Sequence, residues 1–213
     1  MEKIRWGIIG PGNIANNFAD GLKGSYSGQL VSIASKSEDR RKTFGDKYDI
    51  HPDFRFDSYE DIINSEHIDA IYISIPHTLH AEWTIKAAGK GKHILCEKPG
   101  AINFNEGKKI IEAVREAGVF YMEGFMYRCH PQIPKLVEII KSKMIGDIIS
   151  IETSFGFDMG KTIPDHRLFN KNLAGGGILD VGLYPISFSR LIAGVAIGDK
   201  FSEPKFLDAE AKM

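Results

Sequence analysis

The chain has 213 residues, of which 43% are hydrophobic and 26% charged, values typical of one large globular domain or one domain and part of another. Its net charge of −1 gives no support to binding of nucleic acid or an anionic membrane, which would need a basic surface. Two cysteines, Cys96 and Cys129, suit a reducing cytoplasm, and we see no signal peptide and no apolar run of membrane-spanning length. We therefore expect a soluble cytoplasmic protein.

A glycine-rich turn follows the first predicted strand, residues 3–9, and opens an amphipathic helix. The turn has the pattern G-x-G-x-x-A, in which the first glycine makes a tight turn and the second lets a pyrophosphate approach the backbone. The alanine allows close packing of helix and strand, and the helix N-terminus offers N–H groups to phosphates. The pattern predicts a dinucleotide site that includes Gly10, Gly12, Asn13, Ile14 and Ala15.

The second predicted strand, residues 29–35, ends in Ser35-Lys36-Ser37, with Arg40 and Arg41 one turn further on. An NAD site usually has an acidic residue here for the ribose 2′-hydroxyl, whereas a cation fits a 2′-phosphate. The pattern therefore favours NADP over NAD, with Ser35, Lys36 and Arg40 as candidate contacts. Two alternatives stay open: the cations form a solvated helix start, or Glu38 or Asp39 reaches the ribose.

A short helix over residues 58–63 and a buried strand over 70–75 precede a turn with two histidines, followed by a helix to about residue 90. The histidines invite a metal interpretation, which we reject because cysteine or acidic partners at zinc spacing are missing. We instead expect the turn to lie near the cofactor, as capping, packing or contact groups. The candidates are Ile75, Pro76, His77 and His80.

The next predicted strand, residues 91–96, ends in Glu97-Lys98-Pro99. Open α/β sheets bind ligands at the carboxyl ends of their strands, so this lysine would lie where chemistry takes place. Its amine could orient a hydroxyl or carbonyl group and stabilise negative charge on the oxygen. A plain surface lysine is the alternative. We expect the Lys98–Pro99 bond to be cis and list Glu97 and Lys98 among the cofactor contacts.

The remaining pattern predicts a helix over residues 105–118, a short strand over 119–122 and a domain boundary near 127–131. A helix over 134–143, a long strand over 147–157 and a last strand over 205–212 would follow. Between the two strands, three glycines precede a helix that carries Asp180 and Tyr184 four residues apart, which an α-helix places on one face. We predict two domains, residues 1–125 and 126–213.

Together these motifs resemble the glucose-fructose oxidoreductase / inositol dehydrogenase (Gfo/Idh/MocA) family, in its dihydrodiol dehydrogenase and D-xylose dehydrogenase branch. The resemblance implies an α/β protein with an N-terminal Rossmann domain, a doubly wound parallel sheet, and a second α/β domain with a mostly antiparallel sheet. It also implies a homodimer or a higher oligomer for full-length members of the family. Family members are about half again as long, so the second domain would be incomplete here. The matching motifs are Gly10-x-Gly12-x-x-Ala15, Cys96-Glu97-Lys98-Pro99 and Gly175-Gly176-Gly177-x-x-Asp180-x-Gly182-x-Tyr184.

The resemblance implies hydride transfer between nicotinamide and a secondary alcohol or hemiacetal carbon of a sugar, polyol or dihydrodiol. Tyr184 would donate and accept the proton, Lys98 would favour its phenolate, and Asp180 would hold Lys98 or a substrate hydroxyl. Taken singly, Asp180 could be a helix-surface acid and Tyr184 a core aromatic. Two other functions remain: a non-catalytic NADP-binding regulator or scaffold, and chemistry like that of biliverdin reductase.

Overall fold

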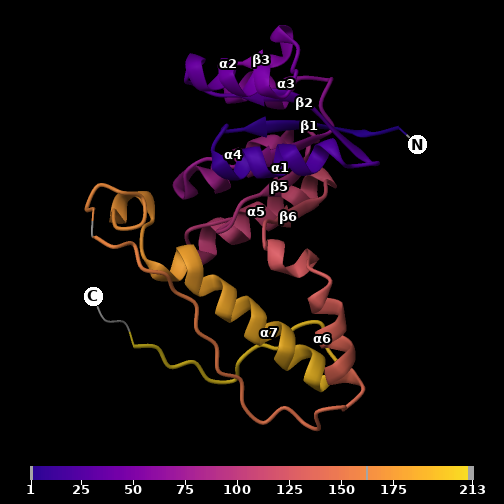
Figure 1. The fold of residues 1–213 in the computed structure, drawn as a ribbon, viewed down its shortest axis with the longest axis vertical. Coiled ribbons are helices and arrows are strands. Elements are labelled where there is room, and N and C mark those ends of the chain that lie inside the picture. The colour runs from indigo at the N-terminus through magenta and orange to yellow at the C-terminus, as the bar shows by residue number, and fades with distance from the viewer. Residues whose placement is uncertain (1, 162, 211–213) are drawn as a thin grey trace. The chain divides into compact units, whose positions relative to one another are not determined.

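The computed structural model describes residues 2–161 and 163–210, and the chain divides into two compact units. The first unit comprises residues 1–124 and 165–175, and the second comprises residues 125–164 and 176–213. The first boundary lies one residue before the predicted one. Residues 165–175 group with the first unit, whereas the sequence predicted them in the second domain. Figure 1 shows the ribbon coloured from indigo at the N-terminus to yellow at the C-terminus.

The first unit is built on a six-stranded sheet in the order β3-β2-β1-β4-β5-β6. Every pair of neighbouring strands is parallel. This is the doubly wound order that the glycine motif predicts, with the switch point between β1 and β4. The strands are β1 (Ile4–Ile9), β2 (Gly28–Ala34), β3 (Arg55–Phe56), β4 (Ala70–Ile73), β5 (His93–Cys96) and β6 (Tyr121–Glu123).

Successive residues of the central strands point to opposite faces of the sheet, and each face is covered by helices. Ile8 and Tyr72 pack in one cluster with α1 (Asn13–Lys23) and α2 (Glu38–Lys47). Ile9 and Ile71 pack in another with α3 (Tyr59–Asn64), α4 (His80–Gly89) and α5 (Phe104–Ala117). The strands are therefore buried on both faces, which explains why they read as continuous apolar runs rather than alternating ones.

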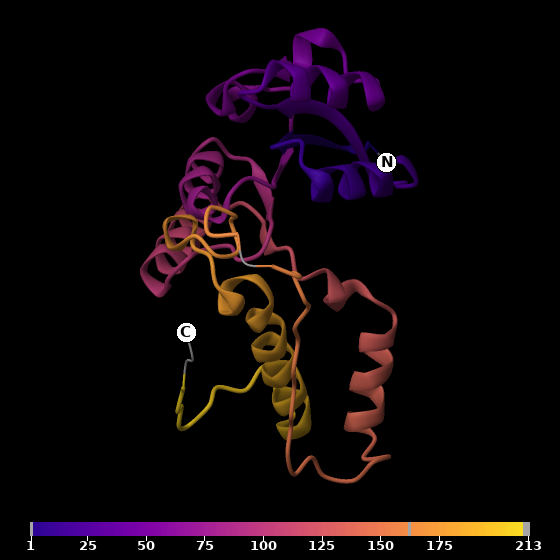
Figure 2. The same cartoon turned by 60° about the vertical axis from the view of Figure 1, so that its left-hand side comes forward.

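In the second unit, α6 (Gln132–Lys141) packs against α7 (Leu183–Ile197), and the two helices run side by side in both ribbon views (Figure 2). The apolar cluster between them is small. It contains Ile140 from α6 and Leu191, Ile192 and Val195 from α7. The side chains of Ile148 and Ile151 pack against the cluster from the segment that follows α6.

The prediction of two strands in the second domain is wrong. Residues 147–157 and 205–210 belong to no strand, and residues 211–212 of the last predicted strand lie outside the described part. The described part of the second unit therefore has helices but lacks the predicted antiparallel sheet. The physical reason is that a strand needs a partner for its backbone groups. Ile148 and Ile151 pack against the helix cluster, the other residues of 147–157 are exposed, and no neighbouring strand is found among the described residues.

The expectation that no apolar run has membrane-spanning length also needs correction. The helical stretch Lys171–Ile197 is long and apolar enough to cross a membrane, judged by length and composition alone. Length and composition are weak evidence for a membrane span, because core helices of soluble proteins share them. Leu191, Ile192 and Val195 in this stretch are buried against α6.

Truncating the sheet core should destabilise the first unit. Ile71 on β4 is fully buried, so Ile71→Ala leaves a cavity and should lower the free energy of unfolding by about 2–5 kcal/mol. Ile111→Ala is the matched control, because Ile111 is 41% exposed and its truncation should change stability by less than about 1 kcal/mol. Urea unfolding followed by circular dichroism measures both. Equal losses for the two variants would contradict the assigned core.

Candidate functional site

The glycine turn lies at the switch point of the sheet and contacts the residues that follow β4. Gly10 has a φ of +93°, and a Cβ there would lie 2.7 Å from the Ile75 Cγ2 atom. The Ser74 hydroxyl donates a hydrogen bond to the Gly10 carbonyl at 2.8 Å. Only glycine fits this position without strain, as the G-x-G-x-x-A pattern predicts.

The opposite holds at Gly12, where an added Cβ would meet no atom within 4 Å. Gly12 precedes α1, no side chain caps this helix, and its first turn has no acidic residue. Free N–H groups and the positive end of the helix dipole therefore remain available to an anion, the arrangement that a pyrophosphate needs. Gly12 and Asn13 are exposed, Ile14 is half-buried, and Ala15 is buried in the core under the helix.

Asn16 is a residue of this turn that the sequence prediction missed. Its side-chain N–H donates to the Gly12 carbonyl at 3.0 Å, and its side-chain oxygen accepts bonds from Lys47 at 2.7 Å and Tyr48 at 2.9 Å. These contacts join the first turn of α1 to the end of α2. The partners lie 31 and 32 residues apart, so short-range sequence patterns carry no signal for the contact.

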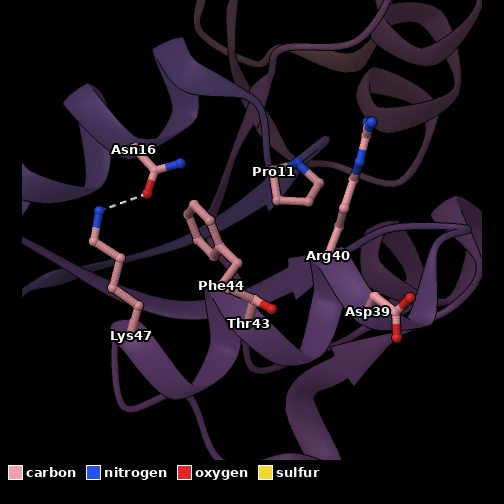
Figure 3. Close-up of a pocket in the computed structure, with 7 residues that line it drawn as sticks. All are labelled: Pro11, Asn16, Asp39, Arg40, Thr43, Phe44 and Lys47. Carbon is pink, nitrogen blue, oxygen red and sulfur yellow. Dashed lines mark hydrogen bonds between the residues drawn. The ribbon is translucent and has the colours of Figure 1, made fainter.

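A cavity of about 220 Å³ opens between the glycine turn and α2 (Figure 3). Arg40 and Pro11 line it, and the remaining lining residues are Asn16, Asp39, Thr43, Phe44 and Lys47. The cations that follow β2 have different roles. Arg40 lines the cavity, the Arg41 guanidinium donates to the Ser35 carbonyl at 2.7 Å, and the Lys36 amine lies 5.7 Å from the Tyr59 ring centre.

The residues on both sides of Lys98 make partly buried hydrogen bonds. The Tyr72 hydroxyl donates to the Glu97 carboxylate at 2.6 Å, and the Gly100 N–H donates to the Glu123 carboxylate at 2.7 Å. Burial and the neighbouring Glu97 charge raise the pKa of Tyr72, so its phenol stays protonated and donates. The Lys98 side chain is half-buried. The Lys98–Pro99 bond is cis, as predicted.

The other candidates at this edge differ in exposure. Pro76 is exposed, His77 is half-buried, and Ile75 and Ser35 are 9% and 5% exposed. His80 is fully buried, and its two ring nitrogens lie against backbone carbonyls, so any part it has in cofactor binding is indirect. Burial raises the pKa of the Cys96 thiol to about 12, which leaves this cysteine unreactive.

Asp180 and Tyr184 belong to the second unit. Asp180 is 8% exposed and lies in a π-helical stretch, Ile178–Gly182, that runs into α7. The α-helical spacing assumed from the sequence therefore does not apply between the two residues, because a π-helix has a longer repeat. The Tyr184 ring lies 5.5 Å from Phe155, 5.7 Å from Phe125 and 6.1 Å from Tyr127, between ring centres, in an aromatic cluster.

The described residues contain no group of three or more His, Cys, Asp and Glu side chains that could hold a metal ion.

A glycine turn at the switch point of a doubly wound sheet, with an uncapped helix behind it, defines a dinucleotide-binding Rossmann domain. Residues 4–125 match the sequence model of the Gfo/Idh/MocA oxidoreductase family, NAD-binding Rossmann fold, and residues 133–199 match the GFO/IDH/MocA C-terminal domain. The chain belongs to this family, as its motifs predict.

Curated relatives lie in the predicted branch. The chain is 34% identical over 191 residues to D-xylose 1-dehydrogenase (NADP(+)) 2 of Haloferax volcanii, covering 90% of this chain and 58% of the relative. It is 34% identical over 201 residues to trans-1,2-dihydrobenzene-1,2-diol dehydrogenase of Mus musculus, covering 93% and 59%. The chain thus spans a little over half the length of these relatives.

Among solved structures, the chain is similar to a 3-ketoreductase from Actinomadura kijaniata in complex with NADP and TDP-benzene. The TM-score is 0.76 and the identity 30%, covering 91% of this chain and 58% of the other. The chain again covers a little over half the length of the protein that it matches.

The two glycines of the turn should respond differently to substitution by alanine. Gly12→Ala adds a methyl group in open space, so thermal stability should stay unchanged while NADPH affinity falls at least about tenfold, or about 1.4 kcal/mol. Gly10→Ala meets the β4 turn at a positive φ and should lose about 1–3 kcal/mol of stability. Calorimetric titration and thermal melts measure the two effects.

Gly24→Ala is the control for this pair, because Gly24 has a φ of −90° and its nearest atom would lie 3.9 Å from the added Cβ. It should change neither property. A Gly12→Ala protein that binds NADPH normally would contradict the assigned position of the pyrophosphate.

Proposed function

We propose that the protein to which this chain belongs is an NADP-dependent oxidoreductase. Its substrate would carry a secondary alcohol or a hemiacetal carbon, as in a sugar, a polyol or a dihydrodiol. The observation that carries the proposal is the juxtaposition, on one edge of the sheet, of the open glycine turn, the cavity lined by Arg40 and the tightly held Lys98 turn. Family membership and the printed activities of the relatives support it.

The cofactor preference rests on the end of β2. The turn Ser35-Lys36-Ser37 contains no carboxylate that could hold a ribose hydroxyl. Its last residue, Ser37, caps α2 by accepting a hydrogen bond from the Arg40 N–H. Arg40 offers a guanidinium beside the glycine turn, suited to two hydrogen bonds with a 2′-phosphate. Asp39 also lines the cavity, and its charge would disfavour a phosphate, so the preference depends on Arg40.

The chemical roles follow from the side chains. The nicotinamide ring, when bound, supplies or accepts the hydride. Lys98, held by its neighbours at the end of β5, would donate a hydrogen bond to the substrate oxygen and stabilise its negative charge. Tyr184 would transfer the hydroxyl proton, and Asp180 would orient Lys98 or a substrate hydroxyl. The roles of Lys98 in the first unit and of Asp180 and Tyr184 in the second are all part of this proposal.

Replacing Arg40 tests the cofactor preference. Arg40→Ala removes a charged hydrogen-bond donor worth about 1.5–3 kcal/mol, so NADP affinity should fall about 10- to 100-fold while NAD affinity changes little. Lys42→Ala is the matched control, an exposed cation on the same helix that does not line the cavity. Titration calorimetry with both cofactors measures the effect. An unmodified protein that binds NAD more tightly than NADP would refute the preference.

Replacing the proposed catalytic residues tests the activity itself. In the full-length protein, Lys98→Ala and Tyr184→Phe should each lower kcat about 10²- to 10⁴-fold and leave NADPH binding nearly intact. Tyr26→Phe is the control, because Tyr26 is 96% exposed and belongs to none of the motifs. Turnover is measured with aldoses, inositols and trans-dihydrodiols. A Tyr184→Phe enzyme with normal kcat would remove the tyrosine from the mechanism.

A further inference from the structure

His80 has an unusual set of partners for a fully buried side chain. Its Nδ1 atom lies 2.7 Å from the Pro99 carbonyl oxygen, and its Nε2 atom lies 2.8 Å from the Ile75 carbonyl oxygen. The ring itself has no exposed surface. One imidazole therefore spans the gap between the turn after β4 and the turn after β5.

Both partners of the ring are carbonyl oxygens, which only accept hydrogen bonds. A neutral imidazole has one N–H and would leave its other nitrogen lone pair facing a carbonyl at hydrogen-bond distance. An imidazolium donates from both nitrogens and satisfies both carbonyls. A buried site penalises an unpaired polar group, and it penalises a charge that lacks hydrogen bonds and an opposite charge. Two acceptor carbonyls and the Glu123 carboxylate together favour the doubly protonated ring.

The charged groups around the ring are compatible with this state. The Glu123 carboxylate on β6 attracts His80, an interaction that lowers the pKa of Glu123, although burial raises that pKa more. Glu97, which directly follows β5, adds a second acidic group near Glu123. The His77 ring lies 5.7 Å from the His80 ring, between centres.

The two carbonyls belong to functionally placed turns. Ile75 contacts the position of Gly10 in the glycine turn, and Pro99 directly follows Lys98. The Glu123 carboxylate accepts a hydrogen bond from the N–H of Gly100, which follows Pro99 in the chain. A ring that ties Pro99 to Ile75 therefore fixes where the Lys98 backbone lies relative to the turn that carries Gly10.

We propose that His80 is a positioning residue that donates from both ring nitrogens and thereby holds the Lys98 turn against the turn after β4. The statement about the ring depends on the geometry alone. Its consequence for turnover rests on the proposed function, in which Lys98 contacts the substrate.

The protonation of the ring is measured directly in the unmodified chain. Nitrogen NMR of the protein labelled in its seven histidines, with His80 assigned by its absence in His80→Gln, should show protons on both ring nitrogens at pH 7. Both protons should exchange slowly with water, because the ring is buried. A His80 ring with one bare nitrogen would overturn the proposal, and this measurement does not require the variant to be stable.

The consequence for Lys98 is measured by comparing His80→Gln with His67→Gln, an exposed histidine of the same unit. Misplacing a catalytic group by about 1 Å can cost about 100-fold in rate, so His80→Gln should lower kcat about 10- to 100-fold. The KM for NADPH should change less than about threefold, a split that general loss of stability would not produce. The NMR signals of the Lys98 side chain should shift in His80→Gln and not in the control.

The outcomes separate the two proposals. If the unmodified full-length protein turns over none of the substrates named above, the proposed function fails, and the ring nitrogens and Lys98 signals still test the role of His80. If His80→Gln folds but leaves both kcat and the Lys98 signals unchanged, His80 does not position the lysine and the inference is wrong.

Discussion

Four residue pairs join β1 to β4 in parallel, from Trp6 opposite Ala70 to Ile9 opposite Ile73. The chain leaves β1 toward one edge of the sheet and returns through β4 toward the other, so this pairing creates the switch point. Beyond its last pair, the Ser74 hydroxyl holds the Gly10 carbonyl. The glycine turn and the turns after β4 and β5 therefore come to one edge because this ladder forms.

Partly buried polar contacts hold the turn at that edge. The bonds of Tyr72 to Glu97 and of Glu123 to Gly100 are shielded in part from water, which makes them electrostatically stronger than bonds in bulk solvent. The same environment penalises any unpaired partner, so these contacts form as a set. A lysine between such anchors can keep one direction, which suits a group that must meet a substrate oxygen.

The second unit depends on a different constraint. Its helices share a small apolar cluster, while Ile149 is 91% and Ile186 56% exposed. The partly alternating pattern of residues 147–157 predicts a strand in a sheet with one face covered. Such a pattern suits an extended backbone but cannot supply the neighbouring strand that a ladder needs. The prediction therefore failed at the step where a distant partner is required.

The parallel sheet, the glycine turn and the position of Lys98 could be predicted from the sequence, because local periodicity and the backbone needs of Gly10 and Gly12 are encoded in consecutive residues. Which of the cations after β2 lines the cavity, Arg40 rather than Arg41, became visible only in the folded chain. The tertiary structure alone brought Asn16 to Tyr48, and His80 to Pro99, from separate elements. Those contacts arise from packing between elements, which no short stretch of sequence encodes.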